Sequence, residues 1–304
     1  MTTAQHQPER VPWKVAVLGP GGVGGLVGAL LARAGDQVTC VAPPTTAAHL
    51  AAHGLQVRSA RFGDFQVPVD AASTLDGSGV DACFVTVKAT QLEAALPAVP
   101  AAALGGGLVV PFLNGIDHVA RLRQHYPPEQ VVAATIRIES ARVAPGVIEQ
   151  ASPFAAVELA SGIPGRARVE ALAERLREVG FDVKVHDDEA RVLWAKLTVL
   201  APIALLTTWA AAPLGEARDR HPDEAKALIG EANAAARAAG VDLDPSIAAA
   251  MMSGAPATMR SSMQRDAEAG RPLELDAIAG PILRAPVDTP VTARLAQDLQ
   301  ARHG

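Results

Sequence analysis

A glycine-rich segment near the start of the chain has the spacing of a phosphate-binding turn. Residues 19–24 are Gly-Pro-Gly-Gly-Val-Gly, between a predicted strand and a predicted helix. In such a turn Gly19 allows a sharp bend, Gly21 lets the backbone approach a pyrophosphate, and Gly24 lets the helix pack closely on the strand. The helix N-terminus adds free N–H groups and a partial positive charge. The spacing predicts a dinucleotide here; the alternative is a glycine turn without a ligand. The predicted contacts are Gly19, Pro20, Gly21, Gly22, Val23 and Gly24.

A lysine stands at the head of the longest uncharged segment of the chain. Lys196 directly precedes Leu197–Leu214, which has 18 residues and no charge. Partial desolvation at such a position lowers the pKa of a lysine toward neutrality, which makes its ammonium a usable acid for a carbonyl oxygen. The alternative is a lysine that extends from a helix end into solvent.

Two further polar clusters lie where a ligand could reach them. Asn114-Gly115 follows a predicted strand, and ligands bind at the carboxyl ends of strands in open α/β sheets. The segments 261–266 (Ser-Ser-Met-Gln-Arg-Asp) and 270–276 (Gly-Arg-Pro-Leu-Glu-Leu-Asp) precede an apolar helix. Plain alternatives exist for both: Asn114 tolerates a left-handed turn, and Glu274 suits the first turn of a helix through the dipole.

The elements that must position these residues fall into two halves. Up to residue 187, β-branched runs alternate with small-residue helical segments, as in βαβ units with a parallel sheet and a late antiparallel extension. The later residues are alanine-rich with helical periodicity. We therefore predict an α/β fold with domains at 1–187 and 188–304. The predicted strands are Lys14–Leu18, Gln37–Ala42, Ala82–Val87, Gly107–Pro111, Gln130–Ile136, Gly146–Glu149, Ala155–Leu159 and Phe181–Val185. The predicted helices are Val23–Ala34, Arg166–Val179, Glu189–Trp209, Ala217–Ala239, Pro245–Ala269 and Leu275–Leu283, with loops at Pro43-Pro44 and Ala285–Pro290.

Composition excludes several classes of protein. With 27 basic and 32 acidic residues the formal charge is −5, which lacks the basic surface of a nucleic-acid binder. The two cysteines and the eight dispersed histidines match no disulfide scaffold or metal motif. Leu197–Leu214 contains Pro202 and Pro213 and is predicted to be a buried core helix rather than a membrane span. Because Met1–Trp13 lacks the apolar stretch of a secretory signal, we expect a cytoplasmic protein.

Taken together, these motifs resemble the ketopantoate reductase (2-dehydropantoate 2-reductase) family. The resemblance rests on five motifs in order, namely 19–24, Thr86-Val87-Lys88, Asn114-Gly115, Leu193-Trp194-Ala195-Lys196 and Ser262…Arg271…Glu274…Asp276. It spans about residues 14–295. It implies a Rossmann-type dinucleotide-binding domain followed by an all-helical domain like the C-terminal domain of 6-phosphogluconate dehydrogenase. It also implies NADPH-dependent reduction of a 2-oxo acid in the cleft between them.

The resemblance also implies roles for individual residues. Lys196 matches the catalytic lysine that supplies the proton, and Glu274 matches the acid that holds substrate and cofactor. Ser262 matches a substrate-binding serine, and Asn114 an asparagine that contacts substrate and cofactor at the nicotinamide side. Lys88 matches a lysine that contacts the NADP phosphate. Ser140 falls at a further cofactor-contact position.

The chain departs from the family's pattern in its polar positions. Asparagines of the family correspond here to Leu200, Ala204, Leu214 and Met259. Burial of an unpaired polar substrate group beside aliphatic side chains costs about 1–3 kcal/mol. We therefore expect the hydride chemistry to be retained and the substrate to be a less polar ketone or imine.

The second strand bears on the choice of cofactor. The family's arginine after this strand is replaced by Pro43, and residues 41–46 contain no acid that would repel a 2′-phosphate. The absence of that acid favours NADP(H) over NAD(H), whereas the absence of the arginine is a departure from the family's NADP-binding pattern that Lys88 answers in part.

Several alternatives stay open from the sequence. The chain could be an authentic 2-dehydropantoate 2-reductase of pantothenate synthesis, a related dehydrogenase of amino or opine-like substrates, or a catalytically silent NADP(H)-binding sensor. A small-molecule carbonyl substrate is the expected partner, with no nucleic acid and no membrane. A homodimer through the helical half is left open.

Overall fold

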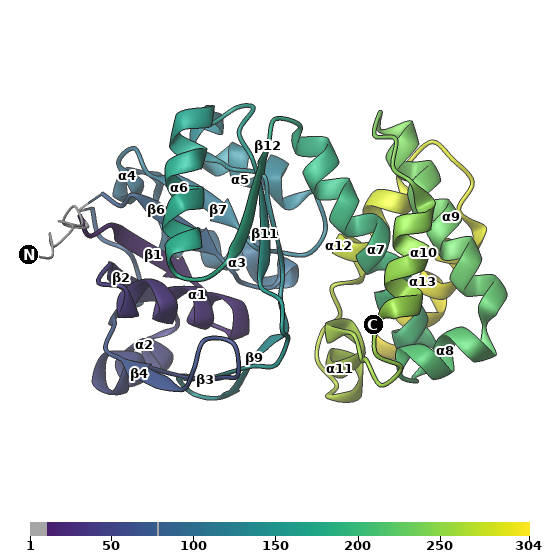
Figure 1. The fold of residues 1–304 in the computed structure, drawn as a ribbon, viewed down its shortest axis with the longest axis horizontal. Coiled ribbons are helices and arrows are strands. Elements are labelled where there is room, and N and C mark those ends of the chain that lie inside the picture. Colours follow the sequence, from purple (N-terminus) through teal and green to yellow (C-terminus); the bar gives the residue numbers. More distant parts are fainter. Residues whose placement is uncertain (1–10, 78) are drawn as a thin grey trace, which may run out of the picture.

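The chain folds into a sheet-containing part and a helical part that lie side by side. The computed structural model describes residues 11–77 and 79–304. Figure 1 shows the sheets and their helices on the left, in purple to teal, and the bundle of green and yellow helices on the right. Residues 1–10 lie outside the described residues, as does most of the polar N-terminal segment on which the expectation of a cytoplasmic protein rests.

The main sheet is parallel and has five strands in the order β5-β2-β1-β6-β7. Every residue of β6 and β7 is buried, as expected for parallel strands with both faces covered. The order reverses between β1 and β6, so the turn after β1 lies at the point where such sheets bind ligands. The strands are β1 Lys14–Leu18, β2 Gln37–Val41, β5 Asp70–Ala72, β6 Ala82–Val85 and β7 Leu108–Pro111.

Two smaller sheets extend this part, with strand orders β4-β3-β10-β9 and β12-β11-β8. Both are mixed: β10 pairs antiparallel with β9 and parallel with β3, and β11 pairs antiparallel with β8 and parallel with β12. The strands are β3 Leu55–Ser59, β4 Phe65–Val67, β8 Ala134–Arg137, β9 Ser140–Ala144, β10 Val147–Gln150, β11 Ala156–Ala160 and β12 Asp182–His186. The strands β3, β4, β5 and β9 lie outside the predicted strands. No residue of β4, β5 or β9 is buried, so their apolar pattern is weak, whereas β3 has alternating buried and exposed residues that the prediction missed.

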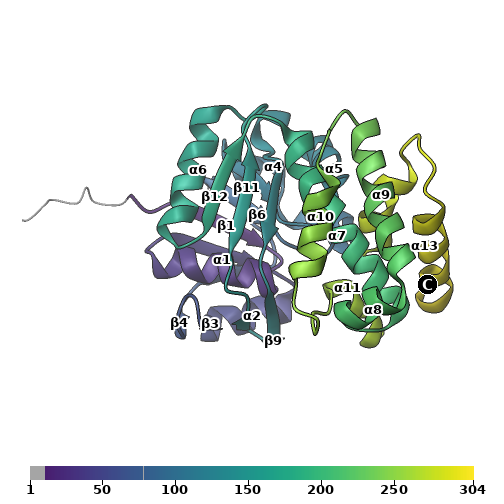
Figure 2. The same ribbon diagram turned by 45° about the vertical axis from the view of Figure 1, so that its right-hand side comes forward.

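Helices pack against the sheets, and Figure 2 shows two of them in front: α1, which packs on β1 and β2 of the main sheet, and α6, which packs on β11 and β12. The predicted loop at Pro43-Pro44 is wrong, because Pro44 is the first residue of α2. Proline is favoured there, since its fixed φ suits the first turn and its missing N–H would be unpaired anyway. The α-helices are α1 Gly22–Arg33, α2 Pro44–His53, α3 Leu92–Ala95, α4 Ala101–Leu104, α5 His118–His125 and α6 Arg166–Glu178. Short 3₁₀ turns lie at η1 Ala89–Gln91, η2 Leu96–Ala98 and η3 Pro128–Gln130.

The helical part consists of seven helices. Two predicted helices, Ala217–Ala239 and Pro245–Ala269, are wrong because each is divided in two. The first is divided into α8 and α9 at His221, which precedes the proline that begins α9, and the second is divided into α10 and α11 by residues 255–261. The last helix, α13, was not predicted. The helices are α7 Glu189–Ala210, α8 Leu214–Arg220, α9 Pro222–Ala238, α10 Pro245–Gly254, α11 Ser262–Glu268, α12 Leu275–Leu283 and α13 Pro290–His303.

The helix α7 is the centre of the helical part. By length and composition α7 could span a membrane, but 72% of its most apolar stretch is buried inside the protein. Its threonine hydroxyls donate to carbonyls of the same helix, for example Thr208 Oγ1 to Ala204 O at 2.6 Å. The prediction of a buried core helix is therefore confirmed. One end of α7 packs against β8 and β11, so its first turns lie at the junction of the two parts.

Candidate active site

The glycine turn after β1 is shaped by the end of β6. Gly19 has φ +84°, a conformation that side chains rarely adopt, and an added methyl group would lie 2.5 Å from Val87 Cγ1. The Thr86 hydroxyl donates to Gly19 O at 2.7 Å. Residues 86 and 87 therefore fix the bend of the turn from the neighbouring strand.

The remaining glycines of the turn differ in what surrounds them. A methyl group on Gly24 would lie 2.1 Å from Thr86 Oγ1, and one on Gly22 would lie 2.3 Å from Ser140 O. On Gly21 the same group would meet only Gly19 O, at 3.9 Å. Gly22 and Gly24 thus serve close packing, whereas Gly21 leaves the space above the start of α1 open.

The turn fits a dinucleotide phosphate. The first turn of α1 contains no acidic residue, so its free N–H groups and positive dipole end face no competing charge. Ser140, at the start of β9, donates from Oγ to Gly22 O at 2.7 Å. Pro20 is buried and Val23 is half-buried beside it.

Three polar side chains from distant segments meet between the two parts. Lys196 on α7 donates from Nζ to Asn114 Oδ1 at 3.1 Å and to Leu113 O at 3.4 Å. Asn114 donates in turn from Nδ2 to Glu274 Oε2 at 3.1 Å, and Glu274 Oε1 accepts from the backbone N–H of Ala89 at 2.8 Å. One amide therefore links an ammonium and a carboxylate that are 78 residues apart in sequence.

The ammonium of Lys196 lies in an environment that weakens its hold on the proton. Burial lowers the pKa of Lys196 to about 8; Glu274 acts in the opposite direction and Arg137 acts in the same direction as burial. A lysine with this pKa is largely protonated at neutral pH and can still release a proton. The arrangement can therefore deliver a proton to an oxygen in the cleft.

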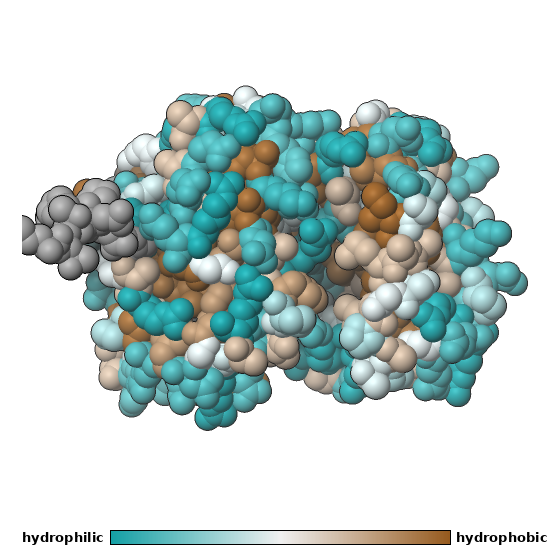
Figure 3. Space-filling model, viewed as in Figure 1, coloured by the Kyte–Doolittle hydropathy of each residue, from teal (hydrophilic) through white to brown (hydrophobic). Residues whose placement is uncertain are grey.

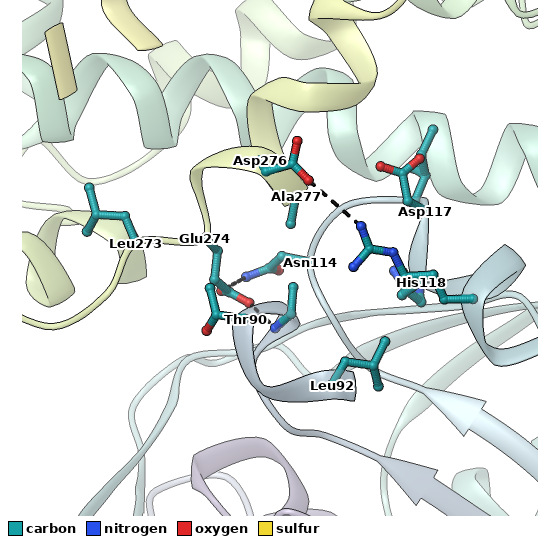
Figure 4. A pocket seen from close by; sticks show the side chains of 12 residues that line it. Thr90, Leu92, Asn114, Asp117, His118, Leu273, Glu274, Asp276 and Ala277 are labelled. Atoms are coloured by element: carbon teal, nitrogen blue, oxygen red, sulfur yellow. Dashed lines mark hydrogen bonds and ion pairs between the residues drawn. The ribbon is translucent and has the colours of Figure 1, made fainter. Parts of the chain in front are cut away.

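A pocket of about 150 Å³ lies against Glu274 and Asn114. Figure 4 shows Glu274 and Asn114 on one side and His118 on the other, with Thr90 below. His118 is 4% exposed, and neither ring nitrogen has a hydrogen-bond partner among the residues described. Burial, with help from Lys196 and Arg121, lowers the pKa of His118 to about 3, so the ring is neutral.

Lys88 lies at the same junction, three residues after the end of β6. Its Nζ donates to Asp266 Oδ2 at 2.5 Å, and Asp266 Oδ1 accepts from Arg271 Nε at 2.8 Å. Asp266 belongs to α11 of the helical part. Lys88, predicted to contact a cofactor phosphate, is thus paired with a carboxylate across the junction.

Ser262 begins α11 and is exposed. The serine before it is the one tied into the fold, because Ser261 caps α11 by accepting from Gln264 N at 3.0 Å and also accepts from Thr207 Oγ1 at 2.8 Å. Ser262, predicted to bind substrate, is thus the exposed one of the two serines.

The four aliphatic positions expected in the cleft do not all lie there. Ala204 and Leu214 are at most 1% exposed and belong to the apolar core of the helical part. That prediction is corrected for these two residues, since side chains enclosed in the core cannot touch a ligand in the cleft. Leu200, one turn after Lys196, and Met259 keep part of their surface. Figure 3 shows the hollow between the two parts, bordered by both apolar and polar residues.

Two family models match the chain in succession. "Ketopantoate reductase PanE/ApbA" matches residues 15–161, and "Ketopantoate reductase PanE/ApbA C terminal" matches residues 189–303. The chain belongs to the ketopantoate reductase family. Its resemblance in motifs is thereby confirmed, as is the fold of a Rossmann-type part followed by a helical part.

Curated relatives and solved structures agree with this family. The chain is 30% identical over 273 residues to the uncharacterized oxidoreductase YkpB of Bacillus subtilis, covering 88% of this chain and 90% of the relative. It is 29% identical over 275 residues to 2-dehydropantoate 2-reductase of Mycobacterium tuberculosis (89% and 90%).

Solved structures match over nearly the full length. A PanE/ApbA family ketopantoate reductase from Ralstonia eutropha JMP134 superposes with TM-score 0.83 and 26% identity, covering 95% of this chain and 98% of that one. A D-mandelate dehydrogenase with NADH and anilino(oxo)acetate superposes with TM-score 0.84 at 22% identity (95% and 98%), a likeness of fold. Family membership makes the chain an NAD(P)-dependent oxidoreductase that reduces a keto group of a small molecule.

The structure adds three residues that sequence reasoning left without a role. These are Asp266, His118 and Arg137, which respectively pair with Lys88, line the pocket and act on the pKa of Lys196. Asp266 stood inside the recognised motif, so its spacing from Ser262 was a usable signal. The sequence contained no pattern that would identify His118 or Arg137 as site residues, because the role of each arises from its contact with residues of a distant element.

Proposed function

We propose that the protein is an NADPH-dependent reductase of a 2-oxo acid or related carbonyl, with Lys196 as the proton donor. The observation that supports this most directly is the linked set of Lys196, Asn114 and Glu274 at the junction of the two parts. In this set a lysine of lowered pKa lies beside residues 113 and 114, just after β7, and the carboxyl ends of parallel strands share one edge of the sheet with the glycine turn.

When bound at the glycine turn, the reduced nicotinamide cofactor supplies the hydride. Lys196 holds a proton at Nζ and gives it to the carbonyl oxygen as that oxygen gains negative charge. Asn114 accepts from Lys196 and thereby fixes the direction of the ammonium. Glu274 holds the amide of Asn114 and, through Ala89, ties the helical part to the sheet part.

The cofactor is proposed to be bound by the glycine turn together with Lys88, Asn114, Ser140 and Glu274. NADP(H) is favoured over NAD(H) because Pro43 and Pro44 follow β2 without a carboxylate to repel a 2′-phosphate. Titration of the protein with NADPH and with NADH tests this: a lower dissociation constant for NADH would contradict it.

The substrate is proposed to be less polar than ketopantoate. Leu200 lies one helical turn from the proton donor and cannot hydrogen-bond a hydroxyl group, and Met259 is the second aliphatic residue that keeps exposed surface. A substrate hydroxyl or second polar group enclosed beside them loses about 1–3 kcal/mol for each unmade hydrogen bond. A carbonyl with an apolar substituent has no such loss. We therefore expect 2-oxo acids with aliphatic or aromatic side chains to be preferred.

A panel of carbonyl compounds assayed with NADPH tests the proposal. Oxidation of NADPH should be fastest with apolar 2-oxo acids, and Lys196→Ala should abolish it while NADPH still binds. Leu200→Asn should shift the preference toward polar substrates, with Leu283→Asn, an exposed residue of α12, as its control. Efficient turnover of ketopantoate with a sub-millimolar KM would contradict the proposed substrate.

The second candidate is an authentic 2-dehydropantoate 2-reductase. It is favoured by the relatives of that name, among them the Mycobacterium tuberculosis protein at 29% identity over most of both chains. The same KM measurement for ketopantoate separates the two candidates.

A further inference from the structure

Two consecutive residues of the sheet part bind two carboxylates of the helical part. Lys88 Nζ donates to Asp266 Oδ2, and the backbone N–H of Ala89 donates to Glu274 Oε1. Asp266 and Glu274 lie on either side of the loop that joins α11 to α12. The start of η1 is therefore bound at two points by the segment of the helical part that runs from α11 to the start of α12.

Asp266 is well suited to hold a cation in place. Its side chain is 7% exposed, and its two oxygens accept from different cations, Lys88 and Arg271. The backbone N–H of Arg271 also donates to Asp266 O at 2.9 Å, which folds the loop back onto the carboxylate. A buried carboxylate held in this way has little freedom to move, so the position of Lys88 is defined by the helical part.

Lys88 is at the same time close to the glycine turn. Val87 packs on Gly19, and Lys88 follows it directly. Neither residues 19–24 nor residues 43–46 contain a lysine or an arginine. An ammonium group has three donors, and Asp266 takes only one of those of Lys88. The remaining donors can serve a phosphate oxygen without breaking the ion pair.

We infer that Asp266 is a positioning residue, which holds the Lys88 ammonium for a cofactor phosphate and so couples cofactor binding to the joining of the two parts. The inference rests on the proposed function, in which Lys88 contacts the cofactor. A cation shared between the phosphate and the Asp266 carboxylate binds both parts at once. A substitution of Asp266 therefore leaves the Lys88 ammonium without a fixed position, and a substitution of Lys88 removes the cation itself.

The experiment is a double-mutant cycle on the dissociation constant for NADPH, measured by fluorescence titration. Lys88→Gln and Asp266→Asn should each weaken binding about tenfold or more, and the double variant should be little weaker than Lys88→Gln alone. In steady-state kinetics the effect of Asp266→Asn should be larger on the KM for NADPH than on kcat, because Asp266 acts on cofactor binding through Lys88 and not on the reacting atoms.

Glu189→Gln is the matched control. Glu189 forms a two-point ion pair with Arg123 across the same two parts, at 2.6 and 2.9 Å, on α5 and α7 rather than beside the glycine turn. It should lower the melting temperature without changing the NADPH dissociation constant. If Asp266→Asn binds NADPH as well as the parent or more tightly, while Lys88→Gln is weakened, the inference is wrong. If Lys88→Gln itself has no effect, the proposed cofactor role of Lys88 fails instead.

A variant that disturbs folding is recognised by a second measurement. Lys88 is 38% exposed in its side chain, so Lys88→Arg can be made without burying new volume. It keeps the charge and the pair with Asp266, and it should recover most of the NADPH affinity that Lys88→Gln loses. A failure of this rescue in a protein of unchanged melting temperature would also overturn the inference.

Discussion

The glycine turn and the polar junction differ in what holds them in place. The turn is held through its own backbone, which accepts or contacts groups close to β1 and β6, such as the Thr86 hydroxyl that donates to Gly19 O. The junction is built from charged and amide side chains of α7, α11, the loop before α12 and the loops after β6 and β7, brought together from positions up to 185 residues apart. The conformation of the turn thus depends on glycines that carry no side chain, whereas the junction depends on the charges and hydrogen-bonding groups of its side chains. Substitutions should therefore affect stability first in one region and catalysis first in the other.

The largest effect is expected at the proton donor. Lys196→Met should lower the kcat of keto reduction by about 10²–10⁴-fold, the usual contribution of a general acid. Its NADPH affinity should change little. Because the ammonium is desolvated in the folded protein, its loss should also leave the melting temperature unchanged or raised. Steady-state kinetics and calorimetry check this, and retention of parental kcat would remove Lys196 from the chemistry.

In the glycine turn, by contrast with Lys196, a substitution should affect stability or cofactor binding rather than kcat. Gly24→Ala should lower the free energy of unfolding by about 1–3 kcal/mol, because its methyl group would collide with Thr86 Oγ1. Gly21→Ala, with open space around it, should unfold like the parent and instead bind NADPH at least about tenfold more weakly. Thermal unfolding and NADPH titration of the two variants test this contrast. Equal stability of both variants would show that the packing argument fails.

The buried imidazole at the edge of the junction should make stability depend on pH. The pKa of His118 is lowered to about 3 in the folded protein, whereas the unfolded chain protonates near pH 6.5. The unfolded state therefore binds the proton first, and the free energy of unfolding falls as pH falls from about 6.5 toward 3, by about 1.4 kcal/mol per pH unit.

Denaturation of His118→Asn at several pH values isolates this contribution. The variant should lose that part of the slope, whereas His125→Asn, an exposed residue of the same helix α5, should retain it. Identical slopes in the parent and in His118→Asn would mean that the imidazole is protonated in the folded protein.

The smallest effect is expected from the charge beside the proton donor. The rate of reduction should fall as pH rises above about 8, since Lys196 must be protonated to act. Arg137→Gln removes a positive charge that lowers this pKa, so the falling limb should move upward, by about half a pH unit. Arg142→Gln, exposed on β9, should leave the limb in place. A downward shift in Arg137→Gln would contradict the electrostatic account.

Local patterns sufficed for the strands and helices that are strongly apolar. Lys14–Leu18 and Leu275–Leu283 have the predicted bounds, because a continuous apolar run marks the strand and apolar residues at helical spacing mark the helix. The short strand Asp70–Ala72 was not predicted, because its extended conformation depends on pairing with β2 and not on an apolar pattern of its own. The division of 217–239 into two helices depended on a proline at the start of the second.

The sequence alone determined the class of protein, its glycine turn and the identity of the candidate acid, since residue type and spacing along one element specify these. Only the tertiary structure decided which of those residues meet. It buried Ala204 and Leu214 in the core and paired Lys88 with Asp266. The physical reason is that burial and charge pairing depend on neighbours from other elements, and those neighbours exist only after the two parts have packed together.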